Sequence, residues 1–460
     1  MIAGIDLGTS SVKVLLTENG KTVFKVKKSY ANDSVKAWIS AVTDALCECG
    51  GYLIDAISLS SQVGTYVING EYVISWRDAV GKDELAKIKA HFSQDEFISE
   101  ISMPHPDIVS YPIPRLLYIK EHYGIKKVCQ PKETIVEFLT GEFVSDKYSW
   151  RGLANLESGD YSQKMLDFIG VNRNVLPKLK SPFDIAGRVS EDAEKATGIK
   201  AGTPVIVGCN DYFAGLVGMG IVKSEMAFDI TGTSAHIGYT SDTLDRDTGM
   251  VSGPYFVGNV HYGVTASCGA ALDFGIQNFG FDNIDIQSSL DKGAPIFLPY
   301  LSGERAPIWD SFARGMFFGI SGDTKKEDLA YSVLEGVAFS EYHVYETLGI
   351  KDKPRAIVTA GGAAKDKKFN MLKASLYGVP VVTLEEKDTS AYGACMIAAV
   401  ATGIYPDIIG ASNDMCRIES VSEPALLPKL RERYELYKKL YETNKENFIE
   451  FSELRKEREK

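Results

Sequence analysis

A weak internal repeat constrains the fold of this chain more than any other feature of its sequence. An apolar strand, a Gly-Thr-Ser turn and a second strand occur at residues 5–15 and again at residues 228–238. A spacing of roughly 225 residues is far too long for a solenoid repeat. The pattern predicts two domains of like design, each opening with a β-hairpin whose glycine-rich tip can approach a phosphate group closely.

The length of the chain agrees with two domains. At 460 residues, the chain exceeds the size at which a single hydrophobic core stops growing, roughly 250–300 residues. The sequence changes character near Ile221–Glu225, where a small-residue helical stretch gives way to the second strand–turn–strand unit. We therefore expect an N-terminal domain over residues 1–221, a C-terminal domain over 222–425 and a charged, solvated helix over 426–460.

Charge and cysteine content exclude several classes of protein. The net charge of −11 and the pI of about 5.3 argue against nucleic acid or an anionic membrane as the main partner. The seven cysteines form no C-x-x-C pair, so free thiols in a reducing compartment are expected. Residues 1–6 lack the basic segment of a signal peptide, and the apolar stretch near 394–404 is too short to span a bilayer. We expect a cytoplasmic protein.

The two hairpin tips are candidate phosphate-binding loops. The first contains Gly8, Thr9 and Ser10, with Lys13 as a nearby cation, and the second contains Gly232 and Thr233. Backbone N–H groups and hydroxyls clustered at a glycine turn suit phosphate oxygens. An ordinary glycine turn explains either tip alone, but two matching tips favour a phosphate held from both domains.

Two aspartates follow buried strands and are candidate catalytic groups. Asp6 ends the first strand, where a carboxylate is costly unless it is paired or near a metal, so Mg²⁺ bound through water and a turn-capping role are both open. Asp211 follows the apolar strand at 203–208 and precedes a small-residue helix at 212–220. It is the best candidate for a general base, with helix N-capping as the alternative.

Other elements are expected from local signals. A second hairpin turns at Asn69-Gly70, and its returning strand is expected to end at Trp76-Arg77-Asp78, an aromatic and polar group suited to sugar hydroxyls or simply to strand-end packing. The segment 324–327 reads as a capping box that starts a long helix. The strand at 356–359 is expected to lead directly into a helix opening at 360–364.

These motifs resemble those of the FGGY carbohydrate kinases. The run Gly315–Ile320 followed by Asp328–Glu335 fits the second signature of that family, and Ser110–His122 resembles the first, with Arg115 for the usual Lys and Tyr118 for the usual Trp. The motifs Asp6–Ser10, Gly208–Asp211, Thr231–Thr233 and Gly361-Gly362 also follow in family order, so the resemblance covers about residues 1–410. It implies an α/β, two-domain actin/hexokinase-like (ribonuclease H-like) fold with ATP in the interdomain cleft.

The resemblance also implies roles for individual residues. Asp211 corresponds to the base that deprotonates the sugar hydroxyl. Sugar-facing positions correspond to Gln62 and Asp78, beside which Trp76 offers an aromatic face by its residue type. ATP and Mg²⁺ are the expected cofactors, with Asp6 as the residue near the metal. The positions that hold the nucleotide correspond to Gly8, Thr9, Ser10, Lys13, Gly232, Thr233, Gly269, Asp273, Gly362 and Asp366. Ala363 and Asn370-Met371 depart from the family pattern at the adenine end. A homodimer is common among such kinases.

The substrate is less constrained than the reaction. The loop Leu298–Asp310 resembles that of xylulose and gluconate kinases, whereas Gln62–Thr65 lacks the Met-His of the xylulose branch and the Arg-Glu of the glycerol branch. We expect a ketopentose, D-xylulose first, with gluconate or another polyol as the alternative. An actin- or chaperone-like ATPase and a catalytically inactive sugar-binding regulator are rival interpretations. The signature runs argue against the first rival, and the presence of Asp211 argues against the second.

Overall fold

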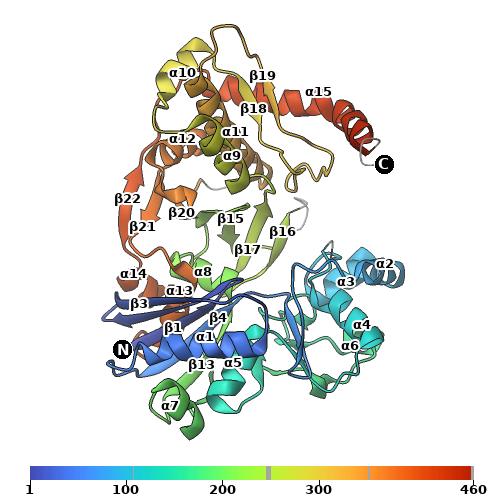
Figure 1. Ribbon diagram of the computed structural model, residues 1–460, viewed down its shortest axis with the longest axis vertical. Coiled ribbons are helices and arrows are strands. Elements are labelled where there is room, and N and C mark those ends of the chain that lie inside the picture. Colours follow the sequence, from blue (N-terminus) through green and yellow to red (C-terminus); the bar gives the residue numbers. More distant parts are fainter. Residues whose placement is uncertain (107, 245–249, 351–352, 457–460) are drawn as a thin grey trace. The chain divides into compact units, whose positions relative to one another are not determined.

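The computed structural model of the protein describes residues 1–106, 108–244, 250–350 and 353–456. They form two compact units (Figure 1). Unit 1 consists of Met1–Val222 and Asp388–Arg417, and unit 2 consists of Lys223–Lys387 and Ile418–Lys460.

A six-stranded sheet forms the centre of unit 1. Its order is β12 (Ile185–Arg188), β13 (Pro204–Asn210), β4 (Ala56–Ser61), β1 (Ile2–Leu7), β2 (Ser11–Glu18) and β3 (Lys21–Ser29). Strand β1 pairs antiparallel with β2 and parallel with β4, and β13 also runs parallel to β4. The three central strands therefore end at the same edge of the sheet.

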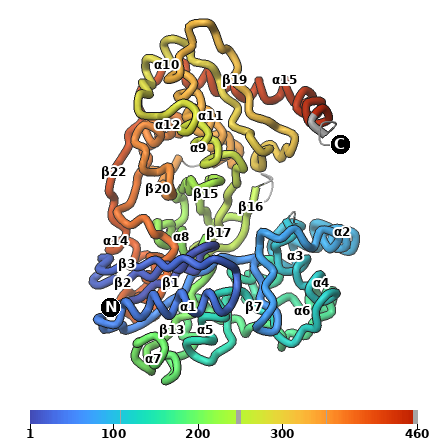
Figure 2. The backbone as a smooth tube through the Cα atoms, in the orientation of Figure 1, coloured from blue at the N-terminus to red at the C-terminus, as the bar shows by residue number. Residues whose placement is uncertain are grey.

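Helices from distant parts of the sequence complete the core of unit 1. Apolar side chains of α1 (Val35–Cys47), α5 (Pro131–Thr140) and α7 (Glu191–Thr197) form one core cluster with the sheet. Helices α8 (Asp211–Gly218) and α13 (Thr389–Ala401) pack against each other and the sheet. Figure 1 labels α13 beside the blue strands of this unit, and Figure 2 traces the same segment as an orange-red tube. The packing is so close that a Cβ on Gly4 would lie 2.0 Å from the Ala391 carbonyl oxygen.

The rest of unit 1 is a helical subdomain with short strands, built around a second core cluster. Its buried apolar side chains include Tyr66, Phe97, Leu116, Trp150 and Leu166. The remaining helices of unit 1 are α2 (Lys82–His91), α3 (Gln94–Ile101), α4 (Pro112–His122), α6 (Gln163–Ile169), the short η1 (Arg173–Val175) and, in the segment Asp388–Arg417, α14 (Ile408–Met415). Its remaining strands are β5 (Tyr66–Ile68), β6 (Tyr72–Ile74), β7 (Val128–Cys129), β8 (Val144–Asp146), β9 (Ala154–Asn155), β10 (Asp160–Tyr161) and β11 (Lys178–Lys180).

Unit 2 repeats the plan of the first sheet. Strand β14 (Ala227–Thr231) pairs antiparallel with β15 (Ala235–Ser241) and parallel with β20 (Ile357–Gly361), just as β1 pairs with β2 and β4. The sheet is completed by β16 (Val251–Pro254), β17 (Asn259–Val264), β21 (Val381–Leu384) and β22 (Ile418–Ser422). The sequence repeat therefore corresponds to a repeat of sheet topology.

One large core cluster lies among the helices and strands of unit 2. The 22-residue α11 (Lys326–Thr347) is buried along most of its length. The other elements are α9 (Gly269–Phe279), α10 (Ile286–Lys292), η2 (Ala363–Lys365), α12 (Lys367–Tyr377), α15 (Leu430–Lys456), β18 (Ile296–Leu298) and β19 (Met316–Phe318).

The structure differs from the sequence expectations at several boundaries. The segment Asp388–Arg417, expected within 222–425, packs with unit 1 because the small residues of α13 allow close contact with β1 and α8. The helix within 426–460 is not fully solvated, since Tyr434, Tyr437 and Tyr441 of α15 are buried in the core of unit 2. The seven cysteines, all of them in the described ranges, form no disulfide, as expected.

Two helix starts also differ. The N-cap of α11 is Lys325, whose N–H donates to the Asp328 carboxylate at 3.0 Å, so the predicted capping box at 324–327 is displaced by one residue. Strand β20 is followed by the short η2 before α12 begins at Lys367, because Asp366 caps that helix.

Candidate active site

Three predicted functional segments meet at one edge of the sheet in unit 1. Ser61, the last residue of β4, lies opposite Leu7 of β1 and Asn210 of β13 in the parallel register. The Gln62 N–H donates to the Leu7 carbonyl at 2.9 Å. Gly8, Gln62 and Asp211 each follow one of these strand ends, so the structure brings the three segments together.

Asp211 is the first residue of α8, directly after the strand. Asn210 is the N-cap, and its Oδ1 accepts a hydrogen bond from the Phe213 N–H at 2.8 Å. The Asp211 Oδ1 accepts from the Tyr212 N–H at 2.8 Å, and the Ser390 hydroxyl donates to the Asp211 carbonyl at 2.9 Å. Because Asn210 takes the capping role, the alternative interpretation of Asp211 as the N-cap is wrong.

The surroundings of Asp211 favour its protonated form. Burial is the main cause, and the Asp6 carboxylate adds to it, so that the pKa of Asp211 is raised to about 7. The residue nevertheless keeps part of its surface accessible. A carboxylate poised near neutral pH is suited to accepting a proton from an alcohol.

Asp6 lies on β1, which is separated from β13 by the single strand β4. Its Oδ1 accepts a hydrogen bond from Ser60 at 2.8 Å. Burial raises the pKa of Asp6, while this hydrogen bond and the Lys13 ammonium oppose the shift. Lys13 faces Asp6 in the β1–β2 register, and its Nζ lies 2.7 Å from Asp388. Sequence reasoning missed Asp388, since nothing in its local sequence links it to the first hairpin.

The first hairpin tip is held by an aromatic residue that was also not predicted. The Gly8 N–H donates to the Ser11 carbonyl at 3.0 Å, which closes the tip. The Tyr30 hydroxyl donates to the Gly8 carbonyl, and the Tyr30 N–H donates to the Ser10 carbonyl at 3.0 Å. Gly8, Thr9 and Ser10 keep part of their surface accessible.

The predicted sugar-facing residues form a second group. The strand β6 ends at Ile74, so Trp76 and Asp78 lie in a turn rather than in the expected strand end. This turn is closed by the Ser75 N–H donating to Asp78 at 2.7 Å, and the Trp76 N–H donates to the Thr65 hydroxyl at 3.1 Å. The side chains of Trp76 and Asp78 are exposed. The turn therefore lies beside the loop that contains Gln62.

Arg115, which stands where the first family signature usually has Lys, forms hydrogen bonds with the backbone of this turn. It is fully buried, and its Nη2 donates to the carbonyls of Ser75 at 3.1 Å and Asp78 at 2.6 Å. Burial lowers the pKa of the guanidinium. One nitrogen, Nη2, therefore contacts both ends of the turn, while Nε and Nη1 have no hydrogen-bond partner among the described residues.

Gln62 combines burial with an unused amide. Its residue surface is 3% exposed. In the described part of the chain, neither its Oε1 nor its Nε2 has a hydrogen-bond partner. Gly64, two residues later, has φ +82°, and a Cβ there would lie 3.0 Å from the Ser110 Cβ and 3.3 Å from the Trp76 Cβ. Neighbouring atoms therefore leave no room for a side chain at position 64. The Gln62 amide, in contrast, can still form hydrogen bonds with both a donor and an acceptor of a ligand.

Unit 2 brings most of its predicted nucleotide residues together. Thr231 of β14 lies opposite Gly361 of β20, so the residues after both strands share one edge. The Gly269 N–H, at the start of α9, donates to the Gly232 carbonyl at 3.0 Å. Gly232, Thr233 and Gly362 are exposed at this edge. Asp273 is exposed one turn along α9, and Asp366 caps α12 by accepting from Lys368 and Phe369.

A buried charged cluster lies beneath the second tip. Lys373 Nζ is 2.7 Å from Asp229 and 3.5 Å from Glu341, and all three side chains are completely buried. The Thr231 hydroxyl donates to Asp229 at 2.8 Å. The Cys268 thiol donates to Glu341 at 3.1 Å. The cluster therefore fixes the residues that immediately precede Gly232 and Gly269, a feature that the sequence did not reveal.

A cation at this site would take few of its ligands from the protein. Among the described residues, no three His, Cys, Asp or Glu side chains are grouped in a way that could hold a metal ion. Mg²⁺ commonly binds one or two carboxylates and completes its shell with phosphates and water. Asp6 is partly accessible and can supply one carboxylate in this mode, in competition with the nearby Lys13 ammonium.

None of the helices in the described ranges is long and apolar enough to cross a membrane.

Family models match both parts of the chain. The N-terminal domain of the FGGY family of carbohydrate kinases matches residues 1–218, and the C-terminal domain of that family matches residues 228–402.

Individual relatives agree over nearly the whole length. The chain is 25% identical over 497 residues to a xylulose kinase of Bacillus subtilis, covering 97% of each protein. It is 28% identical over 463 residues to a gluconokinase of the same organism, covering 90% of this chain and 89% of the relative. A crystal structure of a gluconate kinase from Lactobacillus acidophilus matches with a TM-score of 0.86 and 26% identity, covering 98% of this chain and 99% of that one.

Proposed function

Because the chain belongs to the FGGY family of carbohydrate kinases and has its two-domain actin/hexokinase-like fold, we propose that this sugar kinase phosphorylates a ketopentose, D-xylulose first. Gluconate is the second candidate, since relatives of comparable identity include both a xylulose kinase and a gluconokinase. Kinases of this family use ATP as the phosphoryl donor.

Asp211 is the proposed general base. The observation that carries this assignment is a partly accessible carboxylate with a pKa of about 7, at the strand edge where the Gly8 tip and Gln62 also lie. A base with a pKa near the working pH combines a useful deprotonated fraction with enough basicity to accept the hydroxyl proton. Asp211 would take that proton as the sugar oxygen attacks the γ-phosphorus.

The remaining roles follow from the two groups of residues. Gly8, Thr9, Ser10 and Lys13 would hold phosphate oxygens from unit 1. The residues proposed to hold the nucleotide from unit 2 are Gly232, Thr233, Gly269, Asp273, Gly362 and Asp366. Mg²⁺ near Asp6, bound through water, would neutralise charge on the phosphates. We also propose a cytoplasmic location and, by analogy with the family, a homodimer.

The sugar would contact Gln62, Trp76 and Asp78. The unpartnered amide of Gln62 supports a ligand with adjacent hydroxyls, because an alcohol can both donate to Oε1 and accept from Nε2. Trp76 and Asp78 are exposed residues, and one oxygen of the Asp78 carboxylate accepts the Ser75 N–H while the other has no hydrogen bond to the protein among those described. The carboxylate of Asp78 favours an uncharged sugar over an aldonate, which ranks D-xylulose before gluconate.

ADP release measured with a panel of substrates tests the proposal. Purified protein with ATP and Mg²⁺ is given D-xylulose, another ketopentose, gluconate, glycerol or no sugar. We expect the largest kcat/KM with D-xylulose and little release without sugar. A higher kcat/KM with gluconate would reverse the order of the two substrates. ADP release that no sugar stimulates would refute the kinase assignment.

A further inference from the structure

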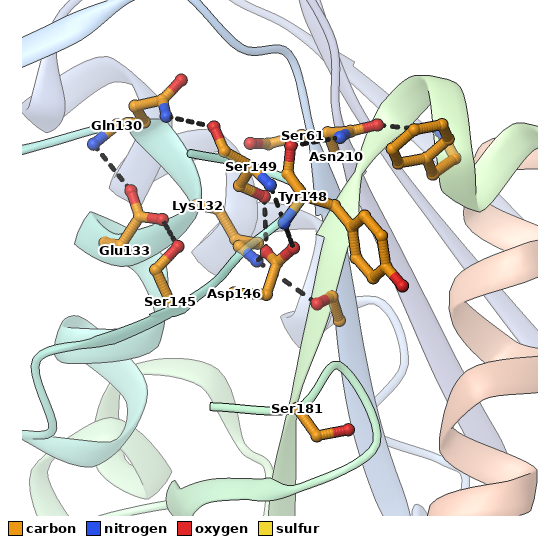
Figure 3. A network of polar contacts seen from close by, with 12 residues as sticks. Ser61, Gln130, Lys132, Glu133, Ser145, Asp146, Tyr148, Ser149, Ser181 and Asn210 are labelled. Carbon is orange, nitrogen blue, oxygen red and sulfur yellow. Dashed lines mark hydrogen bonds and ion pairs between the residues drawn. The ribbon is translucent and has the colours of Figure 1, made fainter. Parts of the chain in front are cut away.

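A buried polar network in unit 1 centres on the turn Asp146–Ser149, called here the 146–149 turn (Figure 3). The Asp146 Oδ1 accepts hydrogen bonds from the N–H groups of Tyr148 at 2.8 Å and Ser149 at 2.9 Å. Its Oδ2 pairs with Lys132 Nζ. The side chains of Asp146 and Lys132 are 0% and 1% exposed. A buried ion pair thus fixes the conformation of one short turn.

One carbonyl of the 146–149 turn reaches the helix that carries the proposed base. Asn210 Nδ2 donates to the Tyr148 carbonyl at 2.9 Å, while Asn210 Oδ1 accepts from the Phe213 N–H. Both ends of this amide are therefore used, and Asn210 is 5% exposed. Asn210 directly precedes Asp211, so the hydrogen bonds that hold Asn210 also fix the backbone position from which the Asp211 side chain extends.

The neighbouring carbonyl reaches the loop that carries Gln62. Gln130 Nε2 donates to the Ser149 carbonyl at 2.6 Å, and Gln130 Oε1 accepts from the Gly64 N–H at 2.8 Å. Gln130 is 1% exposed. This bridge fixes the backbone two residues after the unpartnered Gln62 amide.

We propose that the 146–149 turn sets the separation between the general base and the sugar-binding loop, with Asn210 and Gln130 as its two positioning residues. The inference rests on the proposed function, since it assumes that Asp211 and Gln62 face the same sugar. Neither Asn210 nor Gln130 needs to touch the substrate. Each acts by holding a group that does.

The cost of the ion pair supports a positional role. Removing two charges from water is expensive, and well-packed apolar residues of similar volume often stabilise a fold equally well or better. Apolar side chains in place of Lys132 and Asp146 would therefore stabilise the fold about as well as this ion pair does. What apolar side chains cannot supply is a carboxylate that accepts two backbone N–H groups and orients two successive carbonyls.

Two mild substitutions test the two connections separately. In Asn210→Ser the hydroxyl can still cap α8, but it is too short to donate to the Tyr148 carbonyl as well. We expect kcat to fall on the order of 10–10²-fold, because small displacements of a reacting group have effects of this size. The KM for ATP should stay within about twofold, since binding of the nucleotide is not altered.

Gln130→Met keeps the volume of the side chain and removes both of its hydrogen bonds. We expect the KM for the sugar to rise on the order of 10-fold, with a smaller change in kcat, because the sugar-binding loop rather than the base is released. Ser145→Ala is the matched control. It removes a hydrogen bond from Ser145 to Glu133, whose other oxygen still accepts the Gln130 N–H, and it leaves the side-chain hydrogen bonds of Asn210 and Gln130 in place.

The outcomes separate the inference from the proposed function. A kcat for Asn210→Ser within about twofold of wild type would overturn the inference, as would an equal loss in Ser145→Ala, which would indicate a purely structural network. Thermal melting of each variant confirms that it is folded before kinetics are compared. Failure of the proposed function gives a different result, because wild-type protein would then show no sugar-dependent ADP release.

Discussion

The Asp6 carboxylate raises the pKa of Asp211, although the two residues are 205 positions apart in the sequence. They come together because β1 and β13 flank β4 as parallel strands that end at one edge. Burial of Asp211 is the larger cause of the shift, and Asp6 adds a like charge that disfavours ionisation further. The sheet topology thus sets the acidity of the proposed base.

The pH dependence of the reaction should report this pair. The base accepts a proton only when it is deprotonated, so kcat/KM should rise with pH through about 7. Asp6→Asn removes the like charge and should move this acid limb to lower pH, even if the maximal rate also falls. Initial rates measured from pH 5 to 9 in one mixed buffer test this, with the range chosen to bracket the unperturbed and shifted values. An unchanged midpoint in Asp6→Asn would show that the two carboxylates are not coupled.

Asp211 should also cost the protein stability. Its folded pKa of about 7 lies above the ordinary value of 3.8, so the unfolded chain ionises first and stability is lost as pH rises from about 4 to 7. Asp211→Asn removes this loss and should raise the free energy of unfolding at pH 8 on the order of 1–3 kcal/mol, after allowance for partial exposure. Urea unfolding at pH 8 measures it. The gain should shrink towards pH 4, and a variant less stable than wild type at both values would contradict the sign.

Gln62→Leu should separate binding from folding. The substitution removes an amide that has no partner in the described protein, so the protein should be at least as stable as wild type. The KM for the sugar should rise on the order of 10–10²-fold, because a substrate hydroxyl loses its partner. Steady-state kinetics and thermal melting of the same preparation test both. A large loss of stability with an unchanged KM would show that Gln62 is a structural residue.

The cluster beneath the second hairpin tip predicts a strong asymmetry between substitutions. Lys373→Met leaves the buried carboxylates of Asp229 and Glu341 without their cation and should destabilise the protein by about 3–5 kcal/mol. Burial and the adjacent Asp229 already raise the pKa of Glu341. The triple change Asp229→Leu, Glu341→Leu and Lys373→Met should recover much of that loss. Denaturant unfolding compares the two, and equal stability of the single and triple variants would argue against a charge effect.

The parts of the fold that depend on local pattern could be predicted from the sequence. The hairpin at Asn69-Gly70, the repeated strand–turn–strand units and the strand before Asp211 all carry short-range signals and occur in the structure. The sequence could also select Asp211, because it follows a buried strand and occurs in order with the other motifs. Its assignment as the base remains a proposal.

Features that depend on distant partners could not be predicted. Asp388 meets Lys13 only because α13 returns to the first sheet. Asn210, not Asp211, is the N-cap of α8, and its amide also donates to the Tyr148 carbonyl, 62 residues earlier. The buried charged clusters around Lys132 and Lys373 likewise contain residues from several separate segments of the chain. A single lysine in a helix is ordinarily predicted to lie at the surface, so neither cluster could be recognised from the sequence.

The most direct measurement of the central claim compares ADP release by wild type and Asp211→Asn, each with and without D-xylulose. The wild-type rate should depend on the sugar. Asp211→Asn should bind ATP with similar affinity in a calorimetric titration yet release ADP on the order of 10²–10⁴-fold more slowly with sugar present. Near-full activity in Asp211→Asn would contradict the assignment of this carboxylate as the base that deprotonates the sugar.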